Sequence, residues 1–297
     1  MLLAAFAGAI PVAAESGRWV RGAAKVLTAD PGIRLQEVGG ASMESAEMEL
    51  PRFVTGMFAL RSEGERSVHL RTSNLIRLHW TGPGYFGMER FDQFIEAPGE
   101  AEGRESGFSR MIMNLRNGRL IVDSRPLSAT SQLVLETPVG RITAAPARWA
   151  STVSYDEGSR LYNFTIECLG GTVRFADRRG RTFDLRGGQR LSGVGPAGTL
   201  AIEVGELSEE VERRIAGTGI DEGFDDFAKT ALREFEALLP ALERRARPTP
   251  LEETPRTAEG SGPRARRLII EYAAPPSLLM PFRGEVVPPS EFQSDLF

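Results

Sequence analysis

The stretch that decides the fold runs from Thr130 to Tyr155 and reads TSQLVLETPVGRITAAPARWASTVSY. It reads as a strand, then a Thr-Pro-Val-Gly step at 137–140, then a second strand that breaks at Pro146 before Trp149. Pro138 fixes φ and offers no N–H, while Gly140 permits a bend. We therefore expect a corner that passes the chain from one sheet to the next, with no chemistry assigned to Thr137.

The β pattern extends outward from this stretch, over Phe53 to Gly195. In SVHLRTSNLIRLHW, at 67–80, alternate residues fall on one face, interrupted at Asn74. This face is predicted to be buried and contains Val68, Leu70, Thr72, Ile76, Leu78 and Trp80.

Turn residues divide this region into short strands, as expected of a strand-rich sandwich or solenoid. Gly82-Pro83-Gly84 predicts a turn, and Asn117-Gly118 is a dipeptide typical of hairpins. DEGS at 156–159 and DRRG at 177–180 each begin with Asp and supply a Gly for a tight turn.

After Gly195 the period becomes helical. Ser208 is the expected N-cap, and apolar residues between Asp221 and Arg247 follow helical spacing. We expect a helical segment at 206–247 that packs its Phe/Leu stripe on the β domain.

The C-terminal part, 248–297, reads as a Pro-rich linker and a flexible tail. Its apolar pieces suggest docking, either as an edge strand around Leu268–Tyr272 or onto a partner by β-augmentation; an unstructured tail is the alternative.

Composition, the single cysteine and the first residues limit the classes of protein to which this chain can belong. The chain has 297 residues, a net charge of −4 and a pI near 5.5, which argues against a nucleic-acid partner. The single cysteine, Cys168, lies in a strand-like run and is predicted to be a small core residue. The first residues, 1–14, resemble a signal peptide cut after Ala14, although a positive n-region is missing. These features predict a periplasmic or secreted protein without an integral membrane span.

No motif indicates a cofactor, a metal or catalysis. GGQRLSGVG at 187–195 lacks the Lys-Ser/Thr of a phosphate loop, and no His/Cys cluster has metal spacing. The acidic residues at 221–226 could bind a cation, but they fit the first turn of a helix better. Asp123 and Glu136 could form a glycosidase-like carboxylate pair on neighbouring strands. Aromatic residues could stack on sugars, although core and rim packing is their usual role; these are Trp19, Trp80, Trp149, Tyr85, Tyr155 and Tyr162.

The pattern over 53–195 resembles the FecR domain family of extracytoplasmic domains. RNGRLIVD, the 137–140 step and YNFTIECLGGTVRFADRRGRTFDLRGGQRL follow that family's order of short β signals. The residues that carry the resemblance are Thr137, Pro138, Val139, Gly140, Trp149, Gly171, Val173, Gly188 and Gln189. The chain departs from the family at 146–149, where Pro-Ala-Arg-Trp replaces a Gly-Thr pair and Trp149 takes the aromatic position.

The resemblance implies a FecR-like twisted β-solenoid or sandwich at 53–195, preceded by a β or irregular region at 15–52. It implies the domain alone, because the membrane helix and cytoplasmic region of full-length anti-sigma regulators are not found in the sequence. The function that we expect is a non-enzymatic binding or sensing module in the cell envelope, with a protein or small-ligand partner. A carbohydrate-binding or carbohydrate-active protein and a structural envelope component are the alternatives.

Overall fold

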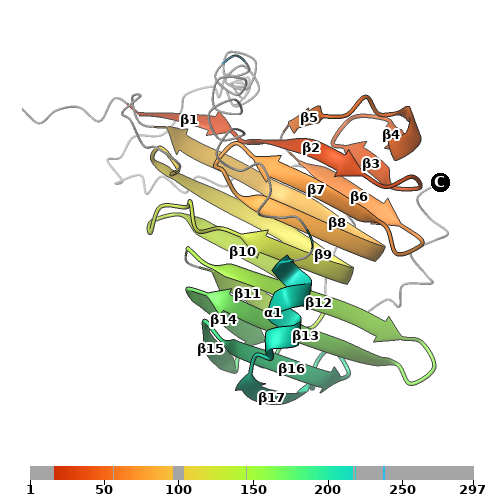
Figure 1. The fold of residues 1–297 in the computed structure, drawn as a ribbon, viewed down its shortest axis with the longest axis vertical. Coiled ribbons are helices and arrows are strands. Elements are labelled where there is room, and N and C mark those ends of the chain that lie inside the picture. The colour runs from red at the N-terminus through yellow and green to blue at the C-terminus, as the bar shows by residue number, and fades with distance from the viewer. Residues whose placement is uncertain are drawn as a thin grey trace, which may run out of the picture.

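The computed structural model describes residues 17–55, 57–95, 104–144 and 146–216, and the single positions 218 and 237. These residues form a mainly β fold of 17 strands, with one short α-helix late in the chain (Figure 1). The mainly β fold class is therefore confirmed. The predicted signal peptide, the helical stripe beyond 218 and the tail at 248–297 lie outside the described residues, apart from position 237.

The strands form two layers that share two long strands, β8 (Arg77–Ile95) and β9 (Phe108–Asp123). The first layer contains, in order, β5 (Arg52–Thr55), β2 (Ala23–Ala29), β7 (Ser67–Thr72), the start of β8, the end of β9, β12 (Arg148–Asp156), β13 (Leu161–Gly170), β16 (Gln189–Gly195) and β17 (Ala201–Glu206). The second contains β4 (Ser42–Glu44), β3 (Arg34–Glu37), β6 (Phe58–Ser62), the rest of β8 and β9, β10 (Gln132–Thr137), β11 (Gly140–Ala144), β14 (Thr172–Asp177) and β15 (Thr182–Arg186).

Two further elements complete the strand arrangement. The strand β1 (Arg18–Arg21) pairs with the end of β8, and a 3₁₀ turn, η1 (Ser45–Glu47), follows β4. The strands before residue 53 thus belong to the same sheet as those after it, and β17 and α1 (Glu209–Ala216) extend the fold beyond 195. The predicted domain boundaries stay a prediction.

The corner between the layers lies in β8 and β9, where the sequence predicted two turns. Three residues of β8, at 82–84, stand opposite the single Gly118 of β9, and both strands continue on either side. The turn and the hairpin predicted at these two sites are therefore wrong. Gly118 has a φ of +105°, a conformation that favours glycine. The residue forms a bulge inside a continuous strand and not a chain reversal.

The Thr-Pro-Val-Gly step is a hairpin turn, so the predicted passage between sheets at this point is wrong. Thr137 pairs with Gly140 across it, and the Thr137 hydroxyl accepts the Gly140 N–H at 3.1 Å and donates to the Gly140 carbonyl at 2.8 Å. A Cβ on Gly140 would lie 2.4 Å from the Ala176 carbonyl oxygen. Close approach of β14 therefore explains the glycine, and no positive φ is involved. The turns predicted at 156–159 and 177–180 are confirmed.

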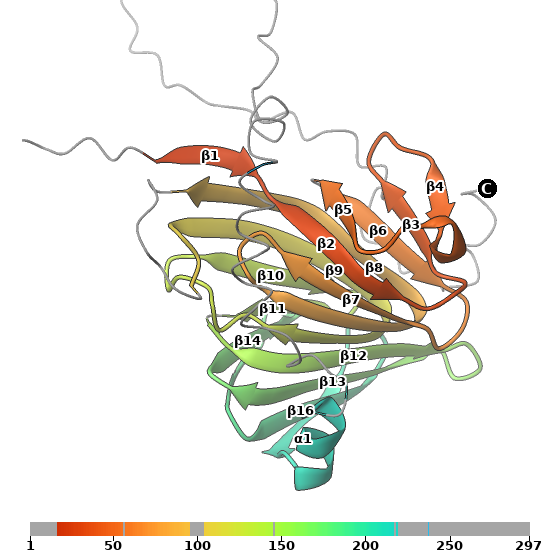
Figure 2. The ribbon, with the colours of Figure 1, turned by 45° about the horizontal axis from the view of Figure 1, so that its top comes forward.

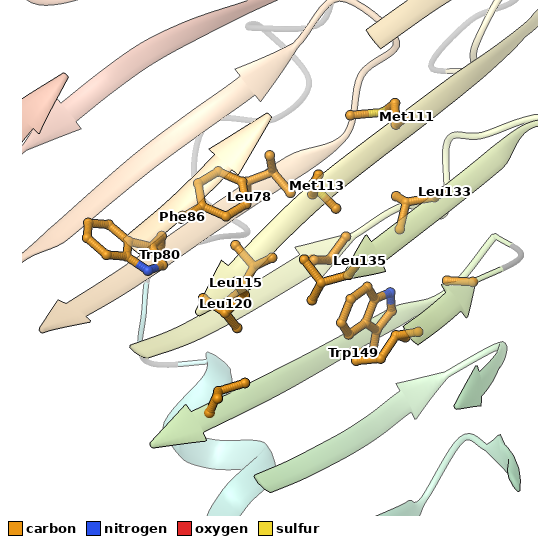
Figure 3. Packing of buried hydrophobic residues seen from close by; sticks show 14 of the residues in the cluster. Leu78, Trp80, Phe86, Met111, Met113, Leu115, Leu120, Leu133, Leu135 and Trp149 are labelled. Atoms are coloured by element: carbon orange, nitrogen blue, oxygen red, sulfur yellow. The ribbon is translucent and has the colours of Figure 1, made fainter. Parts of the chain in front are cut away.

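The core lies between the two layers and takes its side chains from both. Leu133 and Leu135 of β10 face Trp149 of β12, with methionines and leucines of β9 beside them (Figure 3). The alternation predicted over 67–80 is confirmed, because Val68, Leu70, Thr72, Ile76, Leu78 and Trp80 are all buried. Asn74 is buried as well, in a polar cluster at the edge of this core.

The helix α1 lies on the outer surface of the first layer. It begins directly after Ser208, as predicted, and has Glu209 and Glu210 in its first turn. Val211 and Ile215 pack on Ile121 of β9 and Ala150 of β12. Figure 2 shows α1 beside β13 and β16.

Cys168 is fully buried on β13, which confirms the predicted core position. Burial raises the pKa of its thiol, so the reactive thiolate is disfavoured. We expect Cys168→Ser to lower the free energy of unfolding by about 1–2 kcal/mol, because it buries a hydroxyl without an assured partner. Urea titration measures this loss. Rapid labelling of the native thiol by a maleimide would contradict the buried position.

Candidate functional site

Three aromatic side chains, one exposed and two half-buried, form a cluster where β1, β8 and β9 meet. Trp19 of β1 pairs in register with Phe94 of β8, which pairs in turn with Phe108 of β9. We call Trp19, Phe94 and Phe108 the aromatic platform. Strand pairing positions all three rings, so the platform is built on rigid elements of the fold.

The rings of the platform contact one another closely. The indole of Trp19 meets the rings of Phe94 and Phe108 edge-on, at centroid distances of 5.6 and 5.2 Å. The two phenyl rings stack at 5.2 Å, and the guanidinium of Arg110 lies 5.4 Å from the indole centroid. These contacts fix the orientation of the indole before any partner arrives.

The exposure of Trp19 distinguishes it from the other two tryptophans of the chain. Trp19 is 44% exposed, whereas Trp80 and Trp149 are 0% exposed. Charged groups border the platform, since Arg21 and Arg90 bind Asp92 at 2.9 and 2.6 Å. An exposed tryptophan among arginines has the composition of an interface hot spot. Of the predicted core and rim packing, Trp80 and Trp149 therefore show the core role, and Trp19 packs at the rim with much of its indole exposed.

The residues of the family pattern lie elsewhere and have structural surroundings. Val139, Trp149 and Val173 are buried in the core. Gly171 has a φ of +81°, and a Cβ there would lie 2.4 Å from the Pro146 carbonyl oxygen. Gln189 accepts the Arg186 N–H at 2.8 Å across the turn between β15 and β16 that contains Gly188. Arg178 donates to the carbonyls of Thr137 and Pro138, each at 3.1 Å.

The predicted carboxylate pair is not formed. Glu136 of β10 stands beside Asn114 of β9, nine positions away from Asp123. Each carboxylate binds its own arginine: Glu136 binds Arg141 at 2.7 Å, and Asp123 binds Arg125 at 2.6 Å. The two groups therefore do not face a common substrate position, which a glycosidase requires.

A buried polar cluster lies where β9 begins. Glu105 is 7% exposed, and its Oε2 accepts the N–H of Ser128 at 3.0 Å and the hydroxyl of Ser131. The Ser131 hydroxyl also accepts the N–H of Ser109, whose own hydroxyl accepts from Asn74 at 2.8 Å. Burial is the largest influence on Glu105 and raises the pKa of its carboxyl above the ordinary 4.5.

This raised pKa predicts a pH-dependent stability. The folded chain binds the Glu105 proton more tightly than the unfolded chain. The contribution of Glu105 to the free energy of unfolding is therefore fully present below pH 4.5. It is lost as the pH rises through the pKa that this carboxyl has in the folded chain. We expect Glu105→Gln to remove this loss, so that the variant gains stability relative to the native chain between pH 4.5 and 7. Urea titrations across that range test it, with the exposed Glu203→Gln as control; identical pH profiles for the native chain and Glu105→Gln would contradict it.

Two kinds of feature are absent from the described residues. They contain no group of three or more His, Cys, Asp or Glu side chains that could hold a metal ion. None of the helices in the same ranges has the length and apolar character that crossing a bilayer requires.

The chain was compared with family models, curated proteins and solved structures. No family model matches the sequence, and no curated protein matches it. Among solved structures, the chain is similar to a protein from Parabacteroides distasonis ATCC 8503 described as an anti-sigma factor. The identity is 10% and the TM-score 0.31, with 48% of this chain and 57% of that chain covered. The resemblance to the FecR family stays a prediction.

Proposed function

We propose that the chain is a non-enzymatic, extracytoplasmic binding module of FecR type that contacts a partner protein through the aromatic platform. The single observation that carries this proposal is the exposed Trp19, held by two phenyl rings and Arg110 on three paired strands. The location outside the cytoplasm is supported by the export-like residues 1–14.

A protein partner fits the platform better than a sugar. Sugar sites combine an aromatic face with several polar groups that hydrogen-bond the hydroxyls. Here an arginine, Arg110, lies against the indole, and the carboxylate that borders the platform, Asp92, is already bound by Arg21 and Arg90. Trp and Arg are the residues enriched at protein interface hot spots.

The test uses the full-length protein as bait against a solubilised envelope fraction. Truncating a hot-spot tryptophan costs about 2 kcal/mol or more, which is roughly a thirtyfold loss of affinity. We expect Trp19→Ala to lose the captured protein. Val204→Ala is the matched control, because Val204 is 45% exposed on β17 and far from the platform in the sheet order.

Two results would contradict the proposal. Equal capture by Trp19→Ala and the native bait would show that the platform is not the contact. Binding to purified envelope polysaccharide, abolished by Trp19→Ala, would assign the platform to the carbohydrate-binding alternative. Circular dichroism of each variant confirms that the baits are folded.

A further inference from the structure

A row of buried residues lies directly behind the aromatic platform. The three platform residues pair with one another across β1, β8 and β9, and the next pairs in register join Val20, Gln93 and Ser109. Successive residues of a strand point to opposite faces, so this second row faces the interior of the fold. All three of its residues are buried. The groups that bind Gln93 and Ser109 therefore also fix the strand ends that carry the platform.

Hydrogen bonds connect this inner row to the segments around it. The amide oxygen of Gln93 accepts the hydroxyl of Ser73, and the Ser73 oxygen accepts the N–H of Ala23, the first residue of β2, at 3.1 Å. The N–H of Ser109 donates to the hydroxyl oxygen of Ser131 at 2.9 Å. The ends of β8 and β9 are thus each held by a serine from another part of the chain.

Glu105 completes this network from the segment that leads into Phe108. Its Oε2 accepts the hydroxyl of Ser131 and the N–H of Ser128, and its own N–H donates to the Pro126 carbonyl at 2.9 Å. Two residues separate Glu105 from Phe108. Glu105 therefore acts on the platform by two routes, through the hydroxyl of Ser131 and through the chain itself.

These contacts suit the neutral form of the Glu105 carboxyl. Oε2 accepts two hydrogen bonds, whereas Oε1 has no hydrogen-bond partner among the described residues. Oε1 can therefore carry the proton without breaking a bond. Burial is the largest influence on the pKa of this carboxyl and raises it, although the hydrogen bonds from the serines oppose the rise.

The groups that hydrogen-bond the Glu105 side chain in the described part of the chain are uncharged. They are the hydroxyls of Ser109 and Ser131, the N–H of Ser128 and the amide of Asn74. The charged side chains on the surrounding elements are Arg104, which is exposed, Arg110, which lies over the Trp19 indole, and Arg125, which binds Asp123 at 2.6 Å. A buried carboxylate held by neutral groups is costly, so ionisation favours turning this side chain toward water.

We propose that Glu105 is a pH-sensitive switch of the aromatic platform. With its carboxyl protonated, Glu105 holds Ser131 and the segment 104–107 in place, and Phe108 stacks on Phe94. When the carboxyl ionises, the side chain turns outward, Ser131 loses its acceptor and Phe108 leaves the stack. Trp19 then loses one of its two edge contacts. The switch rests on the proposed function in one respect: contact with the partner protein weakens as the pH rises.

Acrylamide quenching of tryptophan fluorescence tests this switch without any partner. Trp19 is the exposed one of the three tryptophans, and Trp19→Phe identifies its share of the signal. We expect the quenching constant of Trp19 to rise about twofold or more above pH 4.5. Glu105→Gln keeps the low value throughout, because its amide supplies the same acceptor oxygen and does not ionise. The matched control, Glu203→Gln on β17, follows the native profile.

Ser131→Ala gives an independent readout, since it removes the connecting hydroxyl and leaves Glu105 in place. We expect its quenching constant to be high already at pH 4.5. A flat native profile, or one profile shared by the native chain, Glu105→Gln and Ser131→Ala, would overturn the switch. Circular dichroism shows whether each variant is folded.

The capture experiment with Trp19→Ala separates this switch from the proposed function. A missing pH response together with capture that depends on Trp19 would reject the switch alone. An intact pH response together with equal capture by Trp19→Ala and the native bait would support the switch and reject the partner contact.

Discussion

Gly118→Ala is expected to destabilise the protein by roughly 3–5 kcal/mol, because two costs act at one position. The backbone φ of Gly118 is +105°, a conformation that residues with a Cβ rarely adopt. The added Cβ would also lie 2.6 Å from the carbonyl oxygen of Thr81 and 3.1 Å from Nε1 of Trp80. Neither neighbour can yield easily, since one is backbone and the other belongs to a fully buried ring.

Gly188→Ala separates the two costs. Gly188 also has a positive φ, of +86°, but no atom lies within 4 Å of the point that a Cβ would occupy there. We expect it to cost only the backbone strain, about 1–2 kcal/mol. Urea denaturation of both variants measures the difference. Equal losses would mean that the corner of β8 and β9 can open to accept a methyl group.

The corner also shows why the sequence misled at Asn117-Gly118. The dipeptide has the composition of a two-residue hairpin, which is a local property. In the structure β9 is paired on both sides, with β8 along its length and with β12 and β10 at its two halves. These long-range pairings outweigh the local preference of Asn117-Gly118 for a hairpin. The glycine therefore lies in a bulge of β9. The alternation at 67–80 was predicted correctly because burial on one face requires that period in any sheet.

The aromatic platform could not be predicted in the same way. Trp19 and Phe94 meet only because β1 pairs with the end of β8, and they are 75 positions apart. A single sequence contains no signal for that register. The outer face of β7 and β8 had a partial signal: the alternation that buries Val68, Leu70 and Leu78 places His69, Arg71, Arg77 and His79 together on the opposite face. The same period of two therefore predicts the composition of both faces, although only the strand register brings Lys25 and Arg119 to the second one.

Trp149→Ala is expected to cost about 3–5 kcal/mol of the free energy of unfolding, the range for truncating a buried large aromatic side chain. Trp149 is 0% exposed on β12 and faces Leu135 of the opposite layer, so its ring connects the two layers across the core (Figure 3). Close-packed surroundings relax only partly around the space that the indole leaves. We expect a large shift of the urea midpoint, and Trp19→Ala, at an exposed position, to shift it little.

Trp149→Phe asks what the buried indole contributes besides volume. Nε1 of Trp149 has no hydrogen-bond partner within the described part of the chain. Removing this N–H therefore breaks no bond there, and the smaller ring still fills most of the space. We expect Trp149→Phe to cost clearly less than Trp149→Ala, about 1–2 kcal/mol. If the phenylalanine variant were as unstable as the alanine variant, the indole N–H would have to bind a group that packing alone does not account for. The position that carries the aromatic residue in the FecR resemblance would then have a polar role as well as a packing role.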